Sequence, residues 1–242
     1  MVMSNFFLKK NVIVTGGNSG SGLAISNAFL KLNSNVIRID KKFDNKIGSL
    51  DITFDLEKYK KIDLLISKIK KKYNKIDILI NNAGVTYPSK NAWKNFNVYH
   101  KTLSVNLHAP FYLISKIINI MSTNSSIIQI TSLGSKLGFE NNPSYQISKA
   151  ALAQLTRCGA VDFKKKKIRF NSICPGYIQT NMTKKSFKSK KRRTAIIERT
   201  ISQRFGKTED IVNAVIFLTS PNSSYINGTS LDIDGGYQVY GY

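Results

Sequence analysis

A glycine-rich turn near the start of the chain restricts the possible folds more than any other feature. An apolar run at residues 11–14 precedes it, residues 15–22 read Thr-Gly-Gly-Asn-Ser-Gly-Ser-Gly, and helical apolar spacing follows over residues 23–30. This order predicts a strand, a tight turn and a helix. Glycine allows positive φ and close approach of the backbone, and the following helix N-terminus offers unpaired N–H groups that suit a pyrophosphate. An ordinary βα turn has the same pattern, so other motifs in the chain are needed to distinguish it from a pyrophosphate-binding turn.

Short β-branched runs alternate with helical stretches over the remaining sequence. The expected strands include residues 36–40, 76–80, 126–130 and 168–173, and the expected helices residues 60–73, 99–121 and 145–162. Strands that alternate with helices of this length predict an α/β fold of Rossmann type, a doubly wound parallel sheet with helices on both faces. The chain has 242 residues and no linker rich in Pro, Gly or Ser, so we expect one domain over residues 1–242.

Tyr145 and Lys149 stand four residues apart in one predicted helix, and Ser132 precedes the tyrosine by thirteen residues. Side chains four apart share a helix face, with Cβ atoms roughly 5–6 Å apart. The ammonium would favour the phenolate and lower the Tyr145 pKa from its ordinary value of about 10 toward neutral pH. This spacing indicates proton-transfer chemistry, and therefore an enzyme.

Six motifs, taken in sequence order, resemble the classical form of the short-chain dehydrogenase/reductase family. They are Thr-Gly-x-x-x-Gly-x-Gly at 15–22, Asn-Asn-Ala-Gly at 81–84, Asn106, Ser132, Tyr-x-x-x-Lys at 145–149 and Pro-Gly-x-x-x-Thr at 175–180. The resemblance covers nearly the whole chain. It implies an NAD(P)-dependent oxidoreductase that interconverts an alcohol and a carbonyl by hydride transfer, with a mobile substrate loop around residues 181–200.

The resemblance also implies where the cofactor binds. The expected cofactor-binding residues are Gly16, Asn18, Ser19, Gly20, Ser21, Gly22, Asp40, Asp55, Leu56, Asn82, Ala83, Gly84, Tyr145, Lys149, Pro175, Gly176, Ile178 and Thr180. Ser21 departs from the family, which usually has an aliphatic residue there. Asp55 matches the spacing of the adenine-binding aspartate of the family, and it is equally suited to be the N-cap of the next helix.

Asp40 bears on the choice between NAD and NADP. It ends a predicted strand about twenty residues after the glycine turn, where a carboxylate can accept hydrogen bonds from the adenosine ribose and repel a 2′-phosphate. This favours NAD. Arg38, Lys41 and Lys42 point the other way, because cations beside the ribose are what an NADP site uses.

Four polar residues are the expected catalytic set: Asn106, Ser132, Tyr145 and Lys149. Tyr145 would exchange a proton with the substrate oxygen while hydride passes to or from the nicotinamide, and Ser132 would polarise that oxygen. By resemblance, Lys149 also binds the nicotinamide ribose and Asn106 holds a water that resupplies protons. The backbone near Ile178 and the side chain of Thr180 would hold the carboxamide.

The charge balance raises an alternative from another class of protein. Lys and Arg number 37 against 14 acidic residues, a formal net charge of +23, which would suit a basic nucleic-acid-binding protein built on a dinucleotide fold. The cations are spread over nearly every predicted helix and no nucleic-acid-binding motif accompanies them. Compositional bias is therefore the favoured explanation, and no specific nucleic acid is expected as a partner.

One basic segment lies within the expected substrate loop. Seven of the ten residues from Lys184 to Arg193 are basic. They predict an anionic substrate, such as a sugar acid, a nucleotide sugar or an acyl group on an acidic carrier protein. From the resemblance we expect a sugar or polyol, with 3-oxoacyl-[acyl-carrier-protein] reduction as the alternative; Asp40 disfavours the latter, since that reductase normally uses NADPH.

Several classes of protein find no support in the sequence. There is no apolar stretch of about 18 residues, and the first ten residues lack the pattern of a signal peptide, so no membrane association and a cytoplasmic location are expected. Two cysteines and two histidines without metal-ligand spacing predict neither a disulfide framework nor a metal site. By resemblance the protein is a homo-oligomer, a tetramer or a dimer, in which Tyr237, Tyr240 and Tyr242 are candidate interface residues.

Overall fold

A parallel sheet forms the centre of the computed structural model, which describes residues 2–240 and, within them, the side chains of all residues except 2–4, 185 and 186. Its seven described strands have the order β3-β2-β1-β4-β5-β6-β7. They are β1 Asn11–Thr15, β2 Asn35–Asp40, β3 Leu50–Thr53, β4 Ile76–Asn81, β5 Met121–Ile130, β6 Arg169–Pro175 and β7 Ser230–Ile233. The predicted Rossmann-type fold is confirmed.

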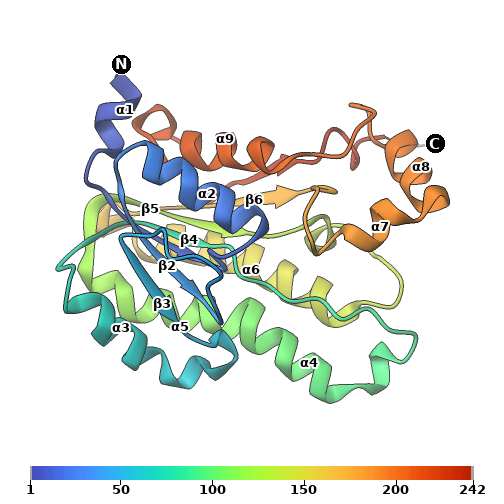
Figure 1. Cartoon of the computed structure of the whole chain (residues 1–242), viewed down its shortest axis with the longest axis horizontal. Coiled ribbons are helices and arrows are strands. Elements are labelled where there is room, and N and C mark those ends of the chain that lie inside the picture. The colour runs from blue at the N-terminus through green and yellow to red at the C-terminus, as the bar shows by residue number, and fades with distance from the viewer. Residues whose placement is uncertain (1, 241–242) are drawn as a thin grey trace.

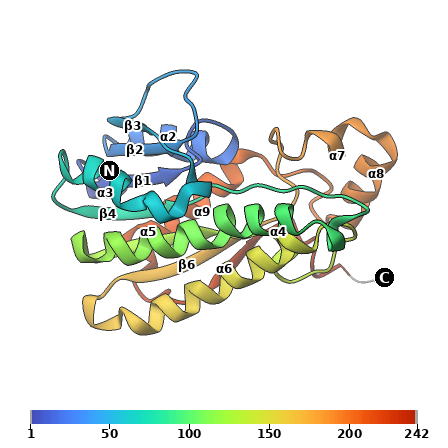
Figure 2. The same cartoon turned by 90° about the horizontal axis from the view of Figure 1, so that it is seen from below.

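Helices cover both faces of the sheet (Figure 1). Helices α2 Gly20–Lys31 and α9 Thr208–Thr219 pack on one face, and α3 Ile62–Lys70, α5 Ala109–Ile117 and α6 Pro143–Asp162 on the other. Seen from below, α4 Phe96–Leu103 continues the line of α5 beside α6 (Figure 2). The remaining described helices are α1 Val2–Phe7, α7 Lys184–Lys188 and α8 Lys190–Arg199.

Each central strand buries both of its faces, as its β-branched sequence predicts. In β1, Ile13 belongs to the apolar core beneath α3 and α5, while Val12 and Val14 belong to the core beneath α2 and α9. The chain leaves β1 toward β2 and β3 and then returns to β4 on the other side of β1. This reversal places a ligand-binding crevice at the carboxyl ends of β1 and β4.

The structure refines two of the predicted helices. The stretch expected as one helix over residues 99–121 is interrupted by a π-helical turn, Ser104–His108, between α4 and α5. The stretch expected over residues 60–73 begins with a 3₁₀ turn, Leu56–Lys61, before α3. Residues 181–200, expected as a mobile loop, contain α7 and α8.

Two expectations about aromatic and sulfur-containing side chains can be compared with the structure. Tyr237 is buried and its ring packs edge-on against Tyr177, so an interface role for Tyr237 was wrong. Tyr240 is partly exposed, and Tyr242 lies outside the described residues. Cys158 and Cys174 are both free thiols.

Candidate active site

A cavity of about 720 Å³ opens at the carboxyl ends of β1, β2, β4, β5 and β6. That volume is typical of a site for a cofactor or small ligand. The predicted site residues that line it are Gly16, Ser19, Gly20, Ser21, Asp40, Leu56, Asn82, Ala83, Gly84, Ser132, Tyr145, Lys149, Pro175, Gly176, Ile178 and Thr180. Asn18, Gly22, Asp55 and Asn106 are not part of the cavity wall.

The glycine turn is shaped by close backbone contacts. Gly16 has φ of +66°, and a Cβ on Gly22 would lie 2.0 Å from the Gly16 carbonyl oxygen, so no side chain fits there. Asn82 Nδ2 donates to the Thr15 carbonyl oxygen at 2.9 Å, which fastens the turn to the segment after β4. Ser19, the N-cap of α2, makes no side-chain cap hydrogen bond, so the first N–H groups of α2 are available to an anionic ligand.

At the other end of the turn, Asp40 accepts two backbone hydrogen bonds, from Asn18 N at 3.0 Å and from Lys41 N at 2.7 Å. Asp40 also lines the cavity, as does Lys41. Asp55 is the N-cap of the turn after β3, where its Oδ1 accepts from Glu57 N at 2.9 Å. The structure therefore assigns Asp55 the capping role, while its neighbour Leu56 contributes to the cavity wall.

The cations that suggested NADP all have carboxylate partners. Lys41 Nζ lies 3.0 Å from Asp55 Oδ1, and Lys42 Nζ lies 3.4 Å from Asp44 Oδ1. Arg38 is 1% exposed and pairs with Asp51 at 2.5 Å, so the suggestion that Arg38 could meet a 2′-phosphate was wrong. Its guanidinium donates to Asp51, to the Gly17 carbonyl oxygen and to the Asn45 carbonyl oxygen.

The side chains of Ser132, Tyr145 and Lys149 come together at the carboxyl end of β5. Ser132 follows the last residues of β5, while Tyr145 and Lys149 project from the first half of α6. Lys149 is 3% exposed, and its Nζ donates to the carbonyl oxygen of Ile130 at 2.7 Å. All three residues line the cavity together with Gly84 and Thr180.

The pKa of Tyr145 differs from the expected one. Burial raises the pKa of the Tyr145 phenol above its ordinary value, and the hydrogen bond with Ser132 acts in the opposite direction. Burial also lowers the pKa of Lys149 to about 8. The expected lowering of the Tyr145 pKa by Lys149 was wrong for the protein alone, because loss of hydration penalises both charged forms.

Asn106 lies in the π-helical turn and is fully buried behind the cavity. Its Oδ1 accepts from Val85 N at 2.8 Å, and its Nδ2 donates to Val85 O and to Ser148 Oγ, each at 3.0 Å. Ser148 Oγ in turn donates to Tyr145 O at 2.7 Å. Asn106 thus ties the segment after β4 to α6, and its expected role in holding a water stays a prediction.

Two loops form the outer wall of the cavity and were not recognised as connected from the sequence. Asn142 Nδ2 donates to Thr86 Oγ1 at 2.9 Å, and Ser89 N donates to Asn141 O at 2.8 Å. Gln146 fixes the second loop through hydrogen bonds to both backbone groups of Phe139. The only sequence signal for Thr86 and Gln146 is their position beside the Asn-Asn-Ala-Gly and Tyr-x-x-x-Lys motifs.

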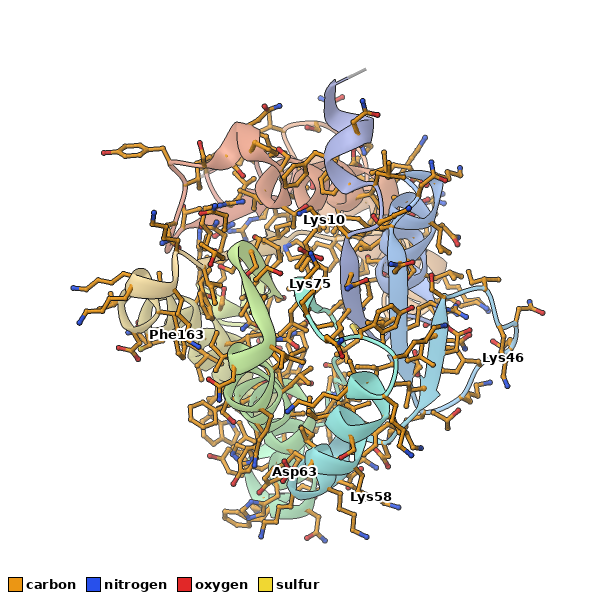
Figure 3. The ribbon with its side chains drawn as sticks, turned by 90° about the vertical axis from the view of Figure 1, so that its left-hand side faces the viewer. Lys10, Lys46, Lys58, Asp63, Lys75 and Phe163 are labelled. Atoms are coloured by element: carbon orange, nitrogen blue, oxygen red, sulfur yellow. The ribbon has the colours of Figure 1, made fainter. Side chains whose placement is uncertain are left out.

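Among the described residues, no cluster of His, Cys, Asp and Glu is arranged to hold a metal ion, and no helix is both long and apolar enough to span a bilayer. Figure 3 shows Lys10, Lys46 and Lys58 on separate parts of one side of the molecule.

The sheet, the glycine turn and the Ser–Tyr–Lys group together define a nicotinamide-dependent oxidoreductase of the short-chain type. Comparison with known proteins agrees: a family model described as enoyl-(acyl carrier protein) reductase matches residues 17–238. The chain belongs to the short-chain dehydrogenase/reductase family, and it is an NAD(P)-dependent enzyme that acts on CH–OH groups.

Curated relatives match over nearly their whole length. An uncharacterized oxidoreductase, YgcW of Escherichia coli K12, is 32% identical, over 98% of this chain and 96% of its own. The 5-keto-D-gluconate 5-reductase of the same organism is 28% identical, over 95% and 96%. A 3-oxoacyl-[acyl-carrier-protein] reductase of Rickettsia felis is 32% identical, over 94% and 96%.

Solved structures show the same fold with either cofactor. A 4-hydroxyisoleucine dehydrogenase complexed with NADH has a TM-score of 0.90 and 29% identity, over 96% of this chain and 100% of that one. A putative 2-deoxy-D-gluconate 3-dehydrogenase from Agrobacterium tumefaciens with bound NADP has a TM-score of 0.86 and 28% identity, over 96% and 98%.

Proposed function

We propose that this enzyme interconverts a secondary alcohol and a ketone on a sugar, sugar acid or polyol, with NAD as the preferred cofactor. The observation that carries the reaction is the meeting of Ser132, Tyr145 and Lys149 in a cavity whose other end is the glycine turn. The substrate class is supported by the keto-gluconate relative and by the polar outer wall of the cavity at Thr86, Asn141 and Asn142.

The residues of the chain fit a dinucleotide. The close contact of Gly16 and Gly22 exposes backbone donors at the start of α2, which would hold the pyrophosphate, and Asp40 would hold the adenosine ribose. The bound nicotinamide supplies or takes the hydride. Gly84 lines the cavity, and a Cβ there would lie 3.3 Å from Lys149 Nζ, so a side chain at this position would crowd the lysine.

Proton transfer falls to Tyr145. Its phenol would donate a proton to the carbonyl oxygen during reduction and take one from the alcohol during oxidation. The Ser132 hydroxyl, hydrogen-bonded with that phenol, would polarise the same substrate oxygen. Lys149 would bind the nicotinamide ribose and favour the tyrosinate once the site is filled, with Asn106 bracing the helix that carries both residues.

The preference for NAD rests on the charges around Asp40. Asp40 lines the cavity beside Lys41, and Arg38, Lys41 and Lys42 are paired with the carboxylates of Asp51, Asp55 and Asp44. We expect Asp40→Asn to raise the Kd for NADH about tenfold and to improve NADPH binding, since a charge-assisted hydrogen bond and a repulsion are removed together. Asp63→Asn is the control, because Asp63 is an exposed carboxylate on α3 that pairs with Lys116 and does not line the cavity. An unchanged NADH to NADPH ratio would contradict the preference.

Arg192 supports an anionic substrate. It lines the cavity, whereas Lys190, Lys191 and Arg193 of the same helix do not. No ion pair among the described side chains engages Arg192. Glu140 lines the same cavity, so an anionic group would be drawn to the arginine and away from the glutamate. The proposed ligand of Arg192 is a carboxylate of the substrate.

A pair of matched substrates tests this role. 5-Keto-D-gluconate and L-sorbose differ in having a carboxylate or a neutral hydroxymethyl group at one end. Arg192→Gln should raise the KM for the keto acid at least about tenfold and leave that for the neutral ketose within about threefold. Arg193→Gln should change neither value. Equal effects on both substrates, or equal effects of both variants, would exclude a carboxylate at Arg192.

Reduction of a 3-oxoacyl thioester on an acidic carrier protein is the second candidate. The Rickettsia felis relative and the exposed cations of α7 and α8 favour it. It predicts turnover of an acetoacetyl thioester with NADPH. The Asp40 carboxylate disfavours this candidate, because it would repel the 2′-phosphate of NADPH.

The primary test measures NADH and NADPH binding and then screens alcohols, sugars and ketones for turnover. Cofactor binding with turnover of a hydroxylated substrate is the expected result. Cofactor binding without turnover, together with tight salt-dependent DNA binding, would instead support the nucleic-acid-binding alternative.

We also propose that the enzyme is a cytoplasmic homo-oligomer, a tetramer or a dimer. Exposed apolar side chains on α5 and α6, Phe111 at 54% and Ile147 at 44%, would be covered by a second copy. Light scattering at micromolar concentration would give the mass, and a monomer would contradict the proposal.

A further inference from the structure

The peptide unit that joins Gly17 to Asn18 is held from both sides by strand β2. Arg38 Nη1 donates to the Gly17 carbonyl oxygen at 3.2 Å, and Asp40 Oδ2 accepts from the Asn18 N–H at 3.0 Å. Between them, the Ile39 carbonyl oxygen accepts from Gly16 N at 2.8 Å. Three consecutive residues of β2 therefore fix three consecutive residues of the glycine turn.

The arginine in this arrangement is itself held rigidly. Arg38 and Asp51 are register partners in β2 and β3, and both oxygens of Asp51 accept from the guanidinium, at 2.7 and 2.5 Å. Arg38 Nη2 also donates to Asn45 O at 2.7 Å, and the Phe43 ring lies 4.7 Å from the guanidinium carbon. Four hydrogen bonds thus hold the guanidinium, one from Nε, one from Nη1 and two from Nη2.

Steric contact reinforces these hydrogen bonds. A Cβ on Gly17 would lie 2.9 Å from Arg38 Cβ, so the stem of the arginine packs directly on the turn. The Arg38 and Asp51 side chains are 1% and 3% exposed. A buried ion pair adds little net stability compared with apolar residues of similar volume, but it fixes the groups it contacts.

We propose that Arg38 and Asp51 are positioning residues for the adenosine and pyrophosphate half of the cofactor site. They set the plane of the peptide between Gly17 and Asn18, and through it the Asp40 carboxylate and the approach to the N-terminus of α2. Neither residue lines the cavity, so both act through the turn. This role rests on the proposed placement of the dinucleotide and is independent of which substrate the enzyme takes.

The test removes both charges together. Arg38→Met with Asp51→Leu leaves no unpaired buried charge, so the double variant should fold. We expect its Kd for ADP-ribose to rise about tenfold or more, which corresponds in free energy to the loss of about one to two hydrogen bonds. The matched control is Lys10→Met with Asp77→Leu, a strand-end pair at the amino edge of the sheet, 3.4 Å apart, and it should leave that Kd within about twofold.

A second variant keeps the inference testable if the double variant is unstable. Arg38→Lys retains the charge opposite Asp51 but lacks the fork that also reaches Gly17. It should raise the ADP-ribose Kd and speed hydrogen exchange at the Asn18 amide, with the melting temperature nearly unchanged. Unchanged ADP-ribose affinity and Asn18 exchange in a folded variant would overturn the inference, and so would an equal loss of affinity in the Lys10 and Asp77 control.

Discussion

Lys149 Nζ lies 5.8 Å from the centre of the Tyr145 ring and donates its hydrogen bond to the backbone of Ile130. The two residues are thus close enough to influence each other's charge, but both are desolvated. In the protein alone burial dominates, so the phenol holds its proton more firmly than usual and the ammonium less firmly. We infer that the ribose and the substrate, by completing the hydrogen bonds of the site, bring the pair to its working state.

Replacing Lys149 should stabilise the protein without cofactor. Burial lowers the pKa of Lys149 from 10.5 to about 8, so the folded state bears a cost for the charged form at pH 7, at most about 3 kcal/mol. Loss of the bond to Ile130 offsets about 1 kcal/mol of this. Lys149→Met should therefore raise the stability of the protein at pH 7 by roughly 2 kcal/mol, or roughly 4–8 °C in Tm.

The pH dependence of that gain distinguishes it from better packing. Between pH 8 and 10.5 the unfolded lysine holds its proton more tightly than the folded one, so the wild-type protein gains stability as pH rises. The advantage of Lys149→Met should shrink over this range. A constant difference in Tm from pH 7 to 10.5 would show that the charge of Lys149 is not the cause.

Removing the Ser132 hydroxyl should move the pH profile of alcohol oxidation. The hydrogen bond with Ser132 lowers the Tyr145 pKa against the effect of burial, so Ser132→Ala should raise that pKa and shift the rising limb of kcat/KM to higher pH. The rate should also fall about 10²–10³-fold, as for loss of one donor to a reacting oxygen. Ser135→Ala, which alters a neighbouring hydroxyl, is the control. A lower rate with an unchanged pH profile would show that Ser132 contributes to substrate binding and does not affect the Tyr145 pKa.

Two glycine-to-alanine variants compare a glycine in close backbone contact with a glycine that has open space around it. A Cβ on Gly22 would lie 2.0 Å from the Gly16 carbonyl oxygen, whereas nothing lies within 4 Å of a Cβ on Gly138. Alanine has a higher helix propensity than glycine, so a loss of NADH affinity on substitution of Gly22 cannot be caused by helix propensity. We expect Gly22→Ala to weaken NADH binding at least about 100-fold, equivalent to roughly 3 kcal/mol, and Gly138→Ala to be neutral. Calorimetric titration of both variants with NADH measures the contrast.

Periodicity and turn composition predicted the fold because most elements of the sheet obey local rules. Strands such as β1 and β4 are short β-branched runs buried on both faces, and the helices between them have apolar stripes. The π-helical turn at Ser104–His108 was not predictable, because it depends on Asn106 reaching Val85 and Ser148, contacts between distant parts of the chain. The start of α6 at Pro143, two residues before Tyr145, fits the preference of proline for the first helical turn.

The sequence located the candidate site better than it located the partners of each residue. Asp40 and the Tyr-x-x-x-Lys pair were found from spacing, and all line the cavity. The partner of Arg38 was missed, since only the pairing of β2 with β3 brings Asp51 opposite it. The shifts in pKa at Tyr145 and Lys149 were also missed, because helical spacing gives proximity and says nothing of desolvation.

Tyr145→Phe removes the phenolic hydroxyl to which we assign proton transfer in the hydride-transfer reaction. NADH binding and single-turnover oxidation of NADH, followed by absorbance with a ketone that the wild-type enzyme reduces, should be measured on the same preparation. We predict a Kd for NADH within about threefold of the wild-type value and a rate lowered at least about 10³-fold. A variant that binds NADH normally and keeps its rate within about threefold would contradict the assignment of Tyr145.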